Sequence, residues 1–138
     1  MMKIVIDTNV LLMILPKLSK YRLAFDALIS GKYTLALSNE ILSEYVEKLE
    51  EKTTVSIANN VAELLNVLPN VEKTEIYYNW SLITKDDDDN KFVDCAIAAR
   101  VRFVVSNDKA FNILKTIDFP KVDVITIEQF VEELLRII

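Results

Sequence analysis

The sequence predicts an α/β fold: a single-domain, three-layer sandwich whose central, mainly parallel sheet of about five strands has helices on both faces. Short β-branched apolar runs alternate with longer amphipathic segments along the chain. The 138 residues fit one domain, because most domains contain about 100–150 residues. Hydrophobic residues make up 51%, enough for a core, while one glycine and three prolines leave little material for linkers.

The first half of the chain contains two expected strands. Residues 2–6 are short, β-branched and followed by Asp-Thr-Asn, which is typical of a buried strand. The second strand is expected at residues 33–37, after a glycine that ends a helix. Ser38 or Asn39 can cap the helix that follows. The helices expected in this half cover residues 10–15, 18–30, 39–52 and 54–68.

In the second half, strands again alternate with helices. Residues 75–80 are aromatic and polar and are expected to form the third strand. Residues 102–106 and 122–126 are apolar runs and give the fourth and fifth strands. The helices expected here cover residues 90–100, 107–114 and 127–138.

Missing residue types exclude several mechanisms. The chain has no histidine, so Ser-His-Asp and Cys-His catalysis and histidine-bound zinc are impossible. Gly31 is the only glycine, which rules out a P-loop or a dinucleotide-binding glycine motif. Cys95 is the only cysteine, which excludes an intrachain disulfide and a multi-cysteine zinc site. Acid–base or metal chemistry must therefore come mainly from Asp, Glu, Lys, Tyr and hydroxyl groups.

The charge is acidic, with 21 Asp and Glu against 16 Lys and Arg. Avid, non-specific nucleic-acid binders normally carry a basic surface, but an enzyme that holds cations in carboxylates can still process nucleic acid. No apolar segment approaches the roughly 20 residues of a membrane span. Asp7 interrupts the first apolar run where a signal peptide would continue, so we expect a cytoplasmic protein without a membrane segment.

Two aspartates follow strands closely. Asp7 comes directly after the first strand, and Asp108 follows the fourth after only Ser106 and Asn107. If the strands are parallel, both acids lie at the same carboxyl edge, where open α/β sheets bind their ligands. Each also has a local interpretation, Asp7 as an N-cap and Asp108 as a first-turn acid. Neither local interpretation explains why both acids share one edge.

Glu44 lies beside the apolar face of the helix expected at residues 39–52. Its neighbours Ile41 and Tyr45 belong to that face, whereas Glu50 points well away. Of the glutamates on this helix, Glu44 lies closest to the core side. The alternative is an ordinary solvated glutamate, and that interpretation holds for the others.

Four consecutive aspartates precede the helix at residues 90–100 and must be solvated, capped or bound to a cation. Asp89 and Asn90 start this helix, which is apolar nearly all round and hence buried. Asp94 lies one turn later and needs a partner. The alternative to a functional role is a capping cluster, with Asp94 paired to Lys91 or Arg100.

Together, Asp7, Glu44, Asp89 and Asp108 can meet at the carboxyl edge of the sheet. Converging oxygen ligands without histidine or cysteine are those that Mg²⁺ or Mn²⁺ prefers. Such an ion would activate water and stabilise charge during hydrolysis of a phosphodiester, which needs no protein nucleophile.

Three stretches in this order resemble the PIN-domain nucleases: "IVIDTNVLL", "LSNEILSEY" and "DDDDNKFVDCAIAARVRFVVSNDKAF". The resemblance covers nearly the whole chain, so residues 1–138 are expected to form one PIN-like domain. It points in particular to the toxins of bacterial and archaeal toxin–antitoxin pairs. In that family a quartet of acids binds Mg²⁺ or Mn²⁺ and cleaves RNA, and a co-expressed antitoxin blocks the cleft.

The resemblance assigns roles to individual positions. Asp7 matches the acid of the first motif, Glu44 that of the second, and Asp108 the acid after the late strand. Asn9 and Ser106 match polar residues that orient carboxylates or water near the metal.

The third acid of the quartet is less defined. Asn90 stands where many relatives have an aspartate, so Asp89 is expected to supply the carboxylate, with Asp86 or Asp94 as alternatives. The same departure leaves open whether the site holds one metal ion or two.

The sequence therefore favours a Mg²⁺- or Mn²⁺-dependent endoribonuclease that is the toxin of a toxin–antitoxin pair. The alternative is a catalytically inactive PIN-like module that binds protein or RNA. An aspartyl-phosphate acceptor ranks last, because "DTN" lacks the second aspartate of the phosphatase motif. A homodimer is implied by the family, with residues 55–68 as a candidate face. The candidate contacts to backbone phosphates are Lys85, Lys91, Arg102 and Lys109.

Overall fold

In the computed structural model, which describes residues 1–138, five strands form one sheet in the order β3-β2-β1-β4-β5. Every neighbouring pair is parallel, so the predicted α/β architecture is confirmed. The strands are β1 (Lys3–Ile6), β2 (Thr34–Leu37), β3 (Val71–Lys73), β4 (Phe103–Val105) and β5 (Val124–Ile125).

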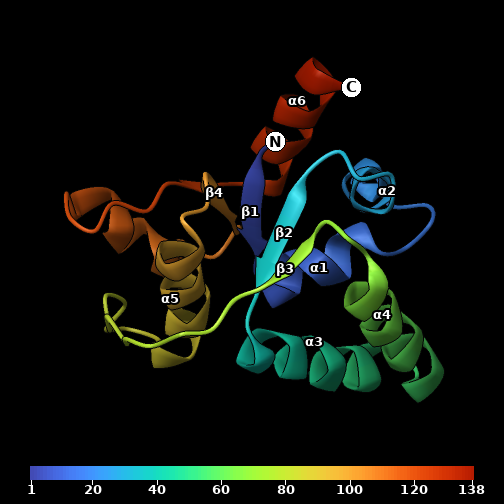
Figure 1. Ribbon diagram of the computed structural model, residues 1–138, viewed down its shortest axis with the longest axis horizontal. Coiled ribbons are helices and arrows are strands. Elements are labelled where there is room, and N and C mark those ends of the chain that lie inside the picture. The colour runs from blue at the N-terminus through green and yellow to red at the C-terminus, as the bar shows by residue number, and fades with distance from the viewer.

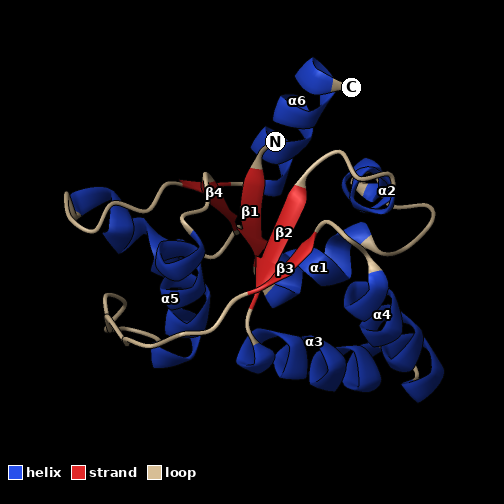
Figure 2. Cartoon of the chain, viewed as in Figure 1, coloured by secondary structure: helices blue, strands red, loops and turns tan.

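Six α-helices and two 3₁₀ helices connect and cover these strands (Figure 2). The α-helices are α1 (Thr8–Ile14), α2 (Arg22–Ile29), α3 (Asn39–Lys52), α4 (Val55–Val67), α5 (Asn90–Ala99) and α6 (Ile127–Ile137). The 3₁₀ helices are η1 (Asp87–Asp89) and η2 (Lys109–Thr116).

The sheet is the middle layer of the molecule. Figure 1 shows α5 on one side of it and α1, α2 and α4 on the other. α5 contacts β1, β2 and β4 and is buried over most of its length, as its apolar sequence predicts. Apolar side chains from both faces join one continuous core, in which the rings of Tyr33 and Phe130 meet edge to face, 5.1 Å apart.

The strand register fixes where the candidate acids lie. Ile6 at the end of β1 pairs with Val105 at the end of β4, and the amide of Asp7 donates to the Val105 carbonyl at 3.1 Å. The strands run toward α3 in Figure 1, so the carboxyl edge of the sheet faces that helix. The predicted edge therefore exists and is flanked by α3 and α5.

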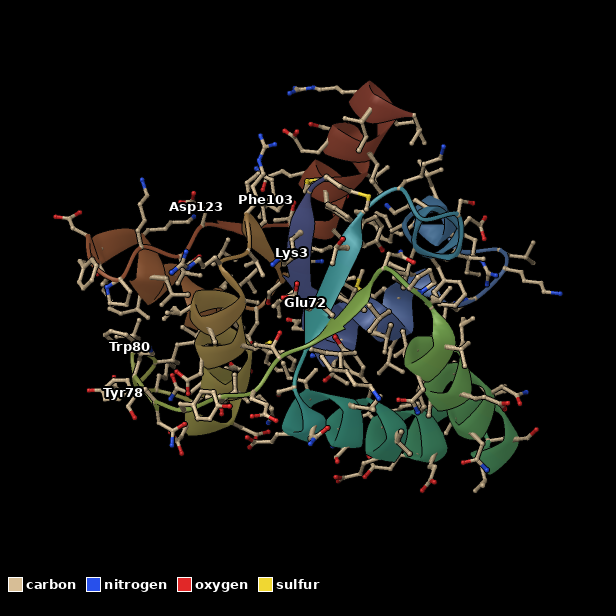
Figure 3. The ribbon with its side chains drawn as sticks, in the orientation of Figure 1. Lys3, Glu72, Tyr78, Trp80, Phe103 and Asp123 are labelled. Carbon is tan, nitrogen blue, oxygen red and sulfur yellow. The ribbon has the colours of Figure 1, made fainter.

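The amino-terminal edge is closed by a different contact. Lys3 donates to Glu72 on β3 at 3.1 Å and to the carbonyl of Ala99 at the end of α5 at 2.8 Å (Figure 3). A lysine near a helix C-terminus also interacts favourably with the helix dipole. This contact holds the end of α5 on the sheet.

The predicted third strand is wrong. β3 covers Val71–Lys73, before residues 75–80, and pairs with β2 from Leu35 to Leu37. The amide of Thr74 donates to the Leu37 carbonyl, after which β2 has turned into α3 and offers no further partner. Residues 75–80 therefore form a loop despite their aromatic content, because strand pairing rather than propensity decides the outcome.

Helix boundaries differ only at a few ends. The helix predicted from residue 18 begins at Arg22, because residues 16–19 form a turn closed by a bond from the Ser19 amide to the Pro16 carbonyl. The short helix predicted after the fourth strand is the 3₁₀ helix η2. No helix is long and apolar enough to cross a membrane.

Candidate metal centre

A pocket of about 180 Å³ opens at the carboxyl edge of the sheet, between α1, α3, α5 and η2. Its lining brings together all four acids that the sequence predicted. The lining residues are Asp7, Thr8, Asn9, Glu44, Lys48, Asp86, Asp88, Asp89, Phe92 and Asp108. A larger hollow of about 490 Å³ lies beside β3, but its two carboxylates, Glu40 and Glu75, are both exposed and do not form a cluster.

Asp7 is the N-cap that the sequence suggested, and its position also places it on the pocket lining. It caps α1, because its Oδ1 accepts the Val10 amide at 2.8 Å, and it also lines the pocket. Its Oδ2 accepts a hydrogen bond from the Ser106 hydroxyl, and the side chain is only 5% exposed. Burial raises the pKa of Asp7, while the hydrogen bonds from Ser106 and Val10 act against that rise.

Ser106 connects the two acids that follow the strands. Its hydroxyl donates to Asp7 and accepts the Asp108 amide at 3.0 Å. Asp108 in turn caps η2, with its Oδ1 accepting the Ala110 amide at 2.9 Å. The shared edge predicted for Asp7 and Asp108 is therefore built through one buried serine.

Three carboxylates converge most tightly. One oxygen from each of Asp86, Asp89 and Asp108 lies within 4.8 Å of the other two. We call these residues the aspartate trio. Asp86 also caps η1 by accepting the Asp88 amide at 3.1 Å, so the run of aspartates coils back toward Asp108.

Asp89 has an uncompensated oxygen. Its Oδ2 is buried and has no hydrogen-bond partner. Burial, together with the nearby charges of Asp108 and Asp86, raises the pKa of Asp89 to about 7. A buried carboxylate oxygen without a donor needs a cation or a proton, and hard oxygen donors suit Mg²⁺ or Mn²⁺. The residues present therefore fit a divalent ion at the trio.

Glu44 lies on another wall of the same pocket. Its Oε2 accepts the Thr8 hydroxyl, and its Oε1 accepts Lys91 Nζ at 2.7 Å. Lys91 also contacts Asp88 Oδ1 at 2.8 Å. Burial acts most strongly on the pKa of Lys91 and would lower it, but the bonds to Asp88 and Glu44 together raise it.

Asn90, which stands at the family's third-acid position, and Asp94, one of the two alternative acids, lie outside the pocket lining. Asn90 uses its amide to hold the loop, bonding the backbone N and O of Ile83 at 2.9 and 2.8 Å and Asp87 Oδ1 at 2.9 Å. Asp94 accepts the Trp80 amide at 3.0 Å and pairs with neither Lys91 nor Arg100, the partners considered from sequence. Both side chains fasten the loop before α5.

The four candidate phosphate contacts separate into two groups. Lys85 and Lys109 are exposed and line one hollow of about 190 Å³. Lys85 directly precedes Asp86 in the sequence, and Lys109 directly follows Asp108. Two placements are wrong. Lys91 is buried and contacts Glu44. Arg102 directly precedes β4 and therefore lies at the opposite edge of the sheet.

The sequence did not identify four members of the site. Thr8, Lys48, Asp88 and Phe92 line the pocket but were not among the predicted site residues. The position of Thr8 was predictable, because it lies between Asp7 and Asn9 in the sequence and must lie at the same edge of the sheet. No signal in the sequence predicted the contact of Lys91 with Glu44, which joins positions 47 residues apart.

Comparisons with known proteins agree with this geometry. A family model described as "PIN domain" matches residues 3–110. No curated protein matches the sequence significantly.

Several solved structures share the fold. VapBC2 from Rickettsia felis, bound to a promoter DNA fragment, is 16% identical over 91% of this chain and 98% of that chain, with a TM-score of 0.62. DNA-bound VapBC from Salmonella typhimurium is 16% identical over 92% and 99%, with a TM-score of 0.60. PAE2754 from Pyrobaculum aerophilum is 14% identical over 98% and 90%, with a TM-score of 0.59.

The family model spans β1 to the first turn of η2 and thus every acid that lines the pocket. The chain belongs to the PIN domain family.

Proposed function

We propose that this protein is a metal-dependent endoribonuclease that hydrolyses RNA phosphodiester bonds, with residues 1–138 acting as one PIN-like domain. Membership of the PIN family supports a nuclease. The observation that carries the proposal is the aspartate trio, with its buried and unpartnered Asp89 oxygen. This arrangement calls for a cation at the edge of the sheet where α/β proteins bind their ligands.

In this proposal Asp86, Asp89 and Asp108 hold Mg²⁺ or Mn²⁺, and Asp7 and Glu44 complete the acidic lining. A bound ion supplies activated water and positive charge opposite the phosphate oxygens. Asp7 is held rigidly by Ser106 and by the first turn of α1, so its carboxylate cannot swing away from the pocket. Asn9 is exposed on the pocket lining and is available to orient water or phosphate.

Lys85 and Lys109 are the residues that would hold the RNA. They line a hollow whose other walls include Ile83, Ala110 and Ile113. Two ammonium groups beside an acidic metal site complement the phosphates on either side of the scissile bond. The exposed side chain of Ile113 adds an apolar surface against which a base can pack.

The partner proposed from the family is an antitoxin protein. The neighbours from Rickettsia felis and Salmonella typhimurium are VapBC complexes, which supports a toxin in a toxin–antitoxin pair. We also propose a cytoplasmic homodimer, with α4 as its face. Val55, Ile57 and Val67 on α4 are exposed apolar side chains that a second copy of the chain would cover in part.

The test is cleavage of an RNA panel with and without Mn²⁺, using wild type, Asp89→Asn, Asp108→Asn and Asp87→Asn. Asp87 is the matched control, because it belongs to the same aspartate run but does not line the pocket. Asp89→Asn and Asp108→Asn should each reduce cleavage at least about 100-fold, because loss of a residue that only supports a ligand already costs up to about 100-fold. Asp87→Asn should cleave like wild type.

Absence of Mn²⁺-dependent cleavage in wild type would contradict the proposal. RNA binding without cleavage and without Mn²⁺ binding would instead identify a catalytically inactive PIN-like binding module.

A further inference from the structure

Lys91 is a buried lysine that contacts two of the carboxylates lining the acidic pocket, Glu44 and Asp88. The residue is 8% exposed and lies in the first turn of α5, two positions after Asp89. Its Nζ donates to Glu44 Oε1 at 2.7 Å, to Asp88 Oδ1 at 2.8 Å and to the Asp88 carbonyl at 2.8 Å. An ammonium group has three N–H donors, so all of them are used inside the protein.

These contacts divide the carboxylates of the pocket into two sets. Both oxygens of Glu44 accept hydrogen bonds, one from Thr8 and one from Lys91. Asp88 also shares the lysine. In contrast, the aspartate trio has no ammonium partner, and its Asp89 Oδ2 accepts nothing. The Glu44 and Asp88 side of the pocket is thus partly neutralised by one ammonium group, whereas the trio has no positive partner.

The ammonium engages the carboxylates that a second cation would need as ligands. Two-metal phosphodiesterases hold their ions about 3.5–4 Å apart with carboxylates around both. Here the remaining carboxylates beyond the trio and Asp7 are Glu44 and Asp88, and both are engaged by one ammonium group. Two like charges on the same ligands would repel each other strongly at this distance.

We infer that Lys91 is a built-in cation that takes the place of a second metal ion, so that the pocket binds one divalent ion, at the aspartate trio. Glu44 is then a positioning residue that holds Lys91 rather than a direct metal ligand. The inference rests on the proposed function, because it assumes that the trio binds the first ion. It also explains how an acidic pocket with six carboxylates folds with a single bound metal.

The test is the stoichiometry of Mn²⁺ binding to the full chain, measured by electron paramagnetic resonance and calorimetric titration in the absence of RNA. Wild type should bind one Mn²⁺ per chain. Lys91→Ala frees Glu44 and Asp88 and leaves room for an ion, so it should bind two. Lys91→Arg keeps the charge and should bind one.

Lys3→Ala is the matched control. Lys3 makes the same kinds of contact, to a glutamate and a backbone carbonyl, but at the opposite edge of the sheet. This variant should bind one Mn²⁺. A change in stoichiometry that appears in Lys91→Ala but not in Lys3→Ala therefore reports the pocket rather than general destabilisation.

A second variant decides the question if Lys91→Ala does not fold. Glu44→Gln keeps one acceptor oxygen for Lys91, and its amide nitrogen can donate to the Thr8 hydroxyl, so it should change the affinity of the single Mn²⁺ site by no more than about threefold. If Glu44 is itself a ligand, the Mn²⁺ affinity of Glu44→Gln should fall by about 10- to 100-fold or more, because loss of a residue that only supports a ligand already lowers metal affinity by about that factor. The larger loss would overturn the inference.

The outcomes separate this inference from the proposed function. Two Mn²⁺ ions in wild type, or one in a folded Lys91→Ala variant, would overturn the role of Lys91 and leave the nuclease proposal standing. No Mn²⁺ bound to wild type would contradict the proposed function itself.

Discussion

Asp7 serves the fold and the pocket at once, and two substitutions separate these roles. Asp7→Asn removes the charge but keeps an amide oxygen that can cap α1 as well as a carboxylate does, and its amide nitrogen can donate to the Ser106 hydroxyl in place of the lost acceptor. Asp7→Ala removes the charge, the cap on Val10 and the acceptor for Ser106. Because both variants lose the charge, the difference in their stability isolates the two hydrogen bonds.

The size of that difference follows from the structure. Loss of the cap costs about 1 kcal/mol, and loss of the buried bond from Ser106 costs about another 1 kcal/mol. Asp7→Ala should therefore be about 2 kcal/mol less stable than Asp7→Asn. For 138 residues the entropy of unfolding is about 0.29 kcal/mol/K, so the melting temperatures should differ by about 7 °C.

The assays are urea unfolding in EDTA and Mn²⁺-dependent RNA cleavage. Asp7→Asn should be at least as stable as wild type, because it removes a charge that burial disfavours, and yet it should not cleave RNA. Thr54→Ala removes a cap of the same kind from α4, remote from the pocket, and should lose stability but keep cleavage. If Asp7→Asn cleaves RNA like wild type, or is as unstable as Asp7→Ala, the reasoning is refuted.

Three further predictions concern the supports of the site. Tyr45→Phe should lower the free energy of unfolding by about 1–3 kcal/mol, because the fully buried Tyr45 hydroxyl donates to the Ile6 carbonyl, which would lose this donor. Urea unfolding measures this loss, and an unchanged midpoint would contradict it. In EDTA, stability should fall as pH rises from 3.8 to about 7, because the raised pKa of Asp89 leaves a proton on the folded state that the unfolded state has released. Asp89→Asn should lose this part of the pH dependence, and an equal slope in both proteins would argue against it. Replacing Lys85 and Lys109 together by alanine should weaken RNA binding in a filter assay and reduce its salt dependence while Mn²⁺ affinity stays within about threefold; intact RNA binding would refute their role.

Local signals in the sequence predict most of the fold and one edge of the site. β-branched runs followed by Asp or Asn identify β1 and β4, and the caps Asp7 and Asp108 occur where the strands end. Parallel pairing then brings both acids to one edge without any knowledge of side-chain contacts. The same reasoning was available for Arg102, whose place at the start of β4 puts it at the opposite edge.

Other features depend on contacts between distant segments. The position of β3 is set by the length of β2, which ends at Leu37, and the aromatic residues after Lys73 carry no signal of that limit. The coiling of the aspartate run brings both Asp86 and Asp89 to Asp108, where the sequence offered them as alternatives. The burial of Lys91 depends on Glu44 reaching it from α3.

An anomalous difference map of a crystal grown with Mn²⁺ would show whether the aspartate trio binds a divalent ion. We expect one strong peak coordinated by carboxylate oxygens of Asp86, Asp89 and Asp108, and no such peak in crystals of Asp89→Asn. No peak at the trio at saturating Mn²⁺, or a peak held elsewhere in the molecule, would contradict this expectation.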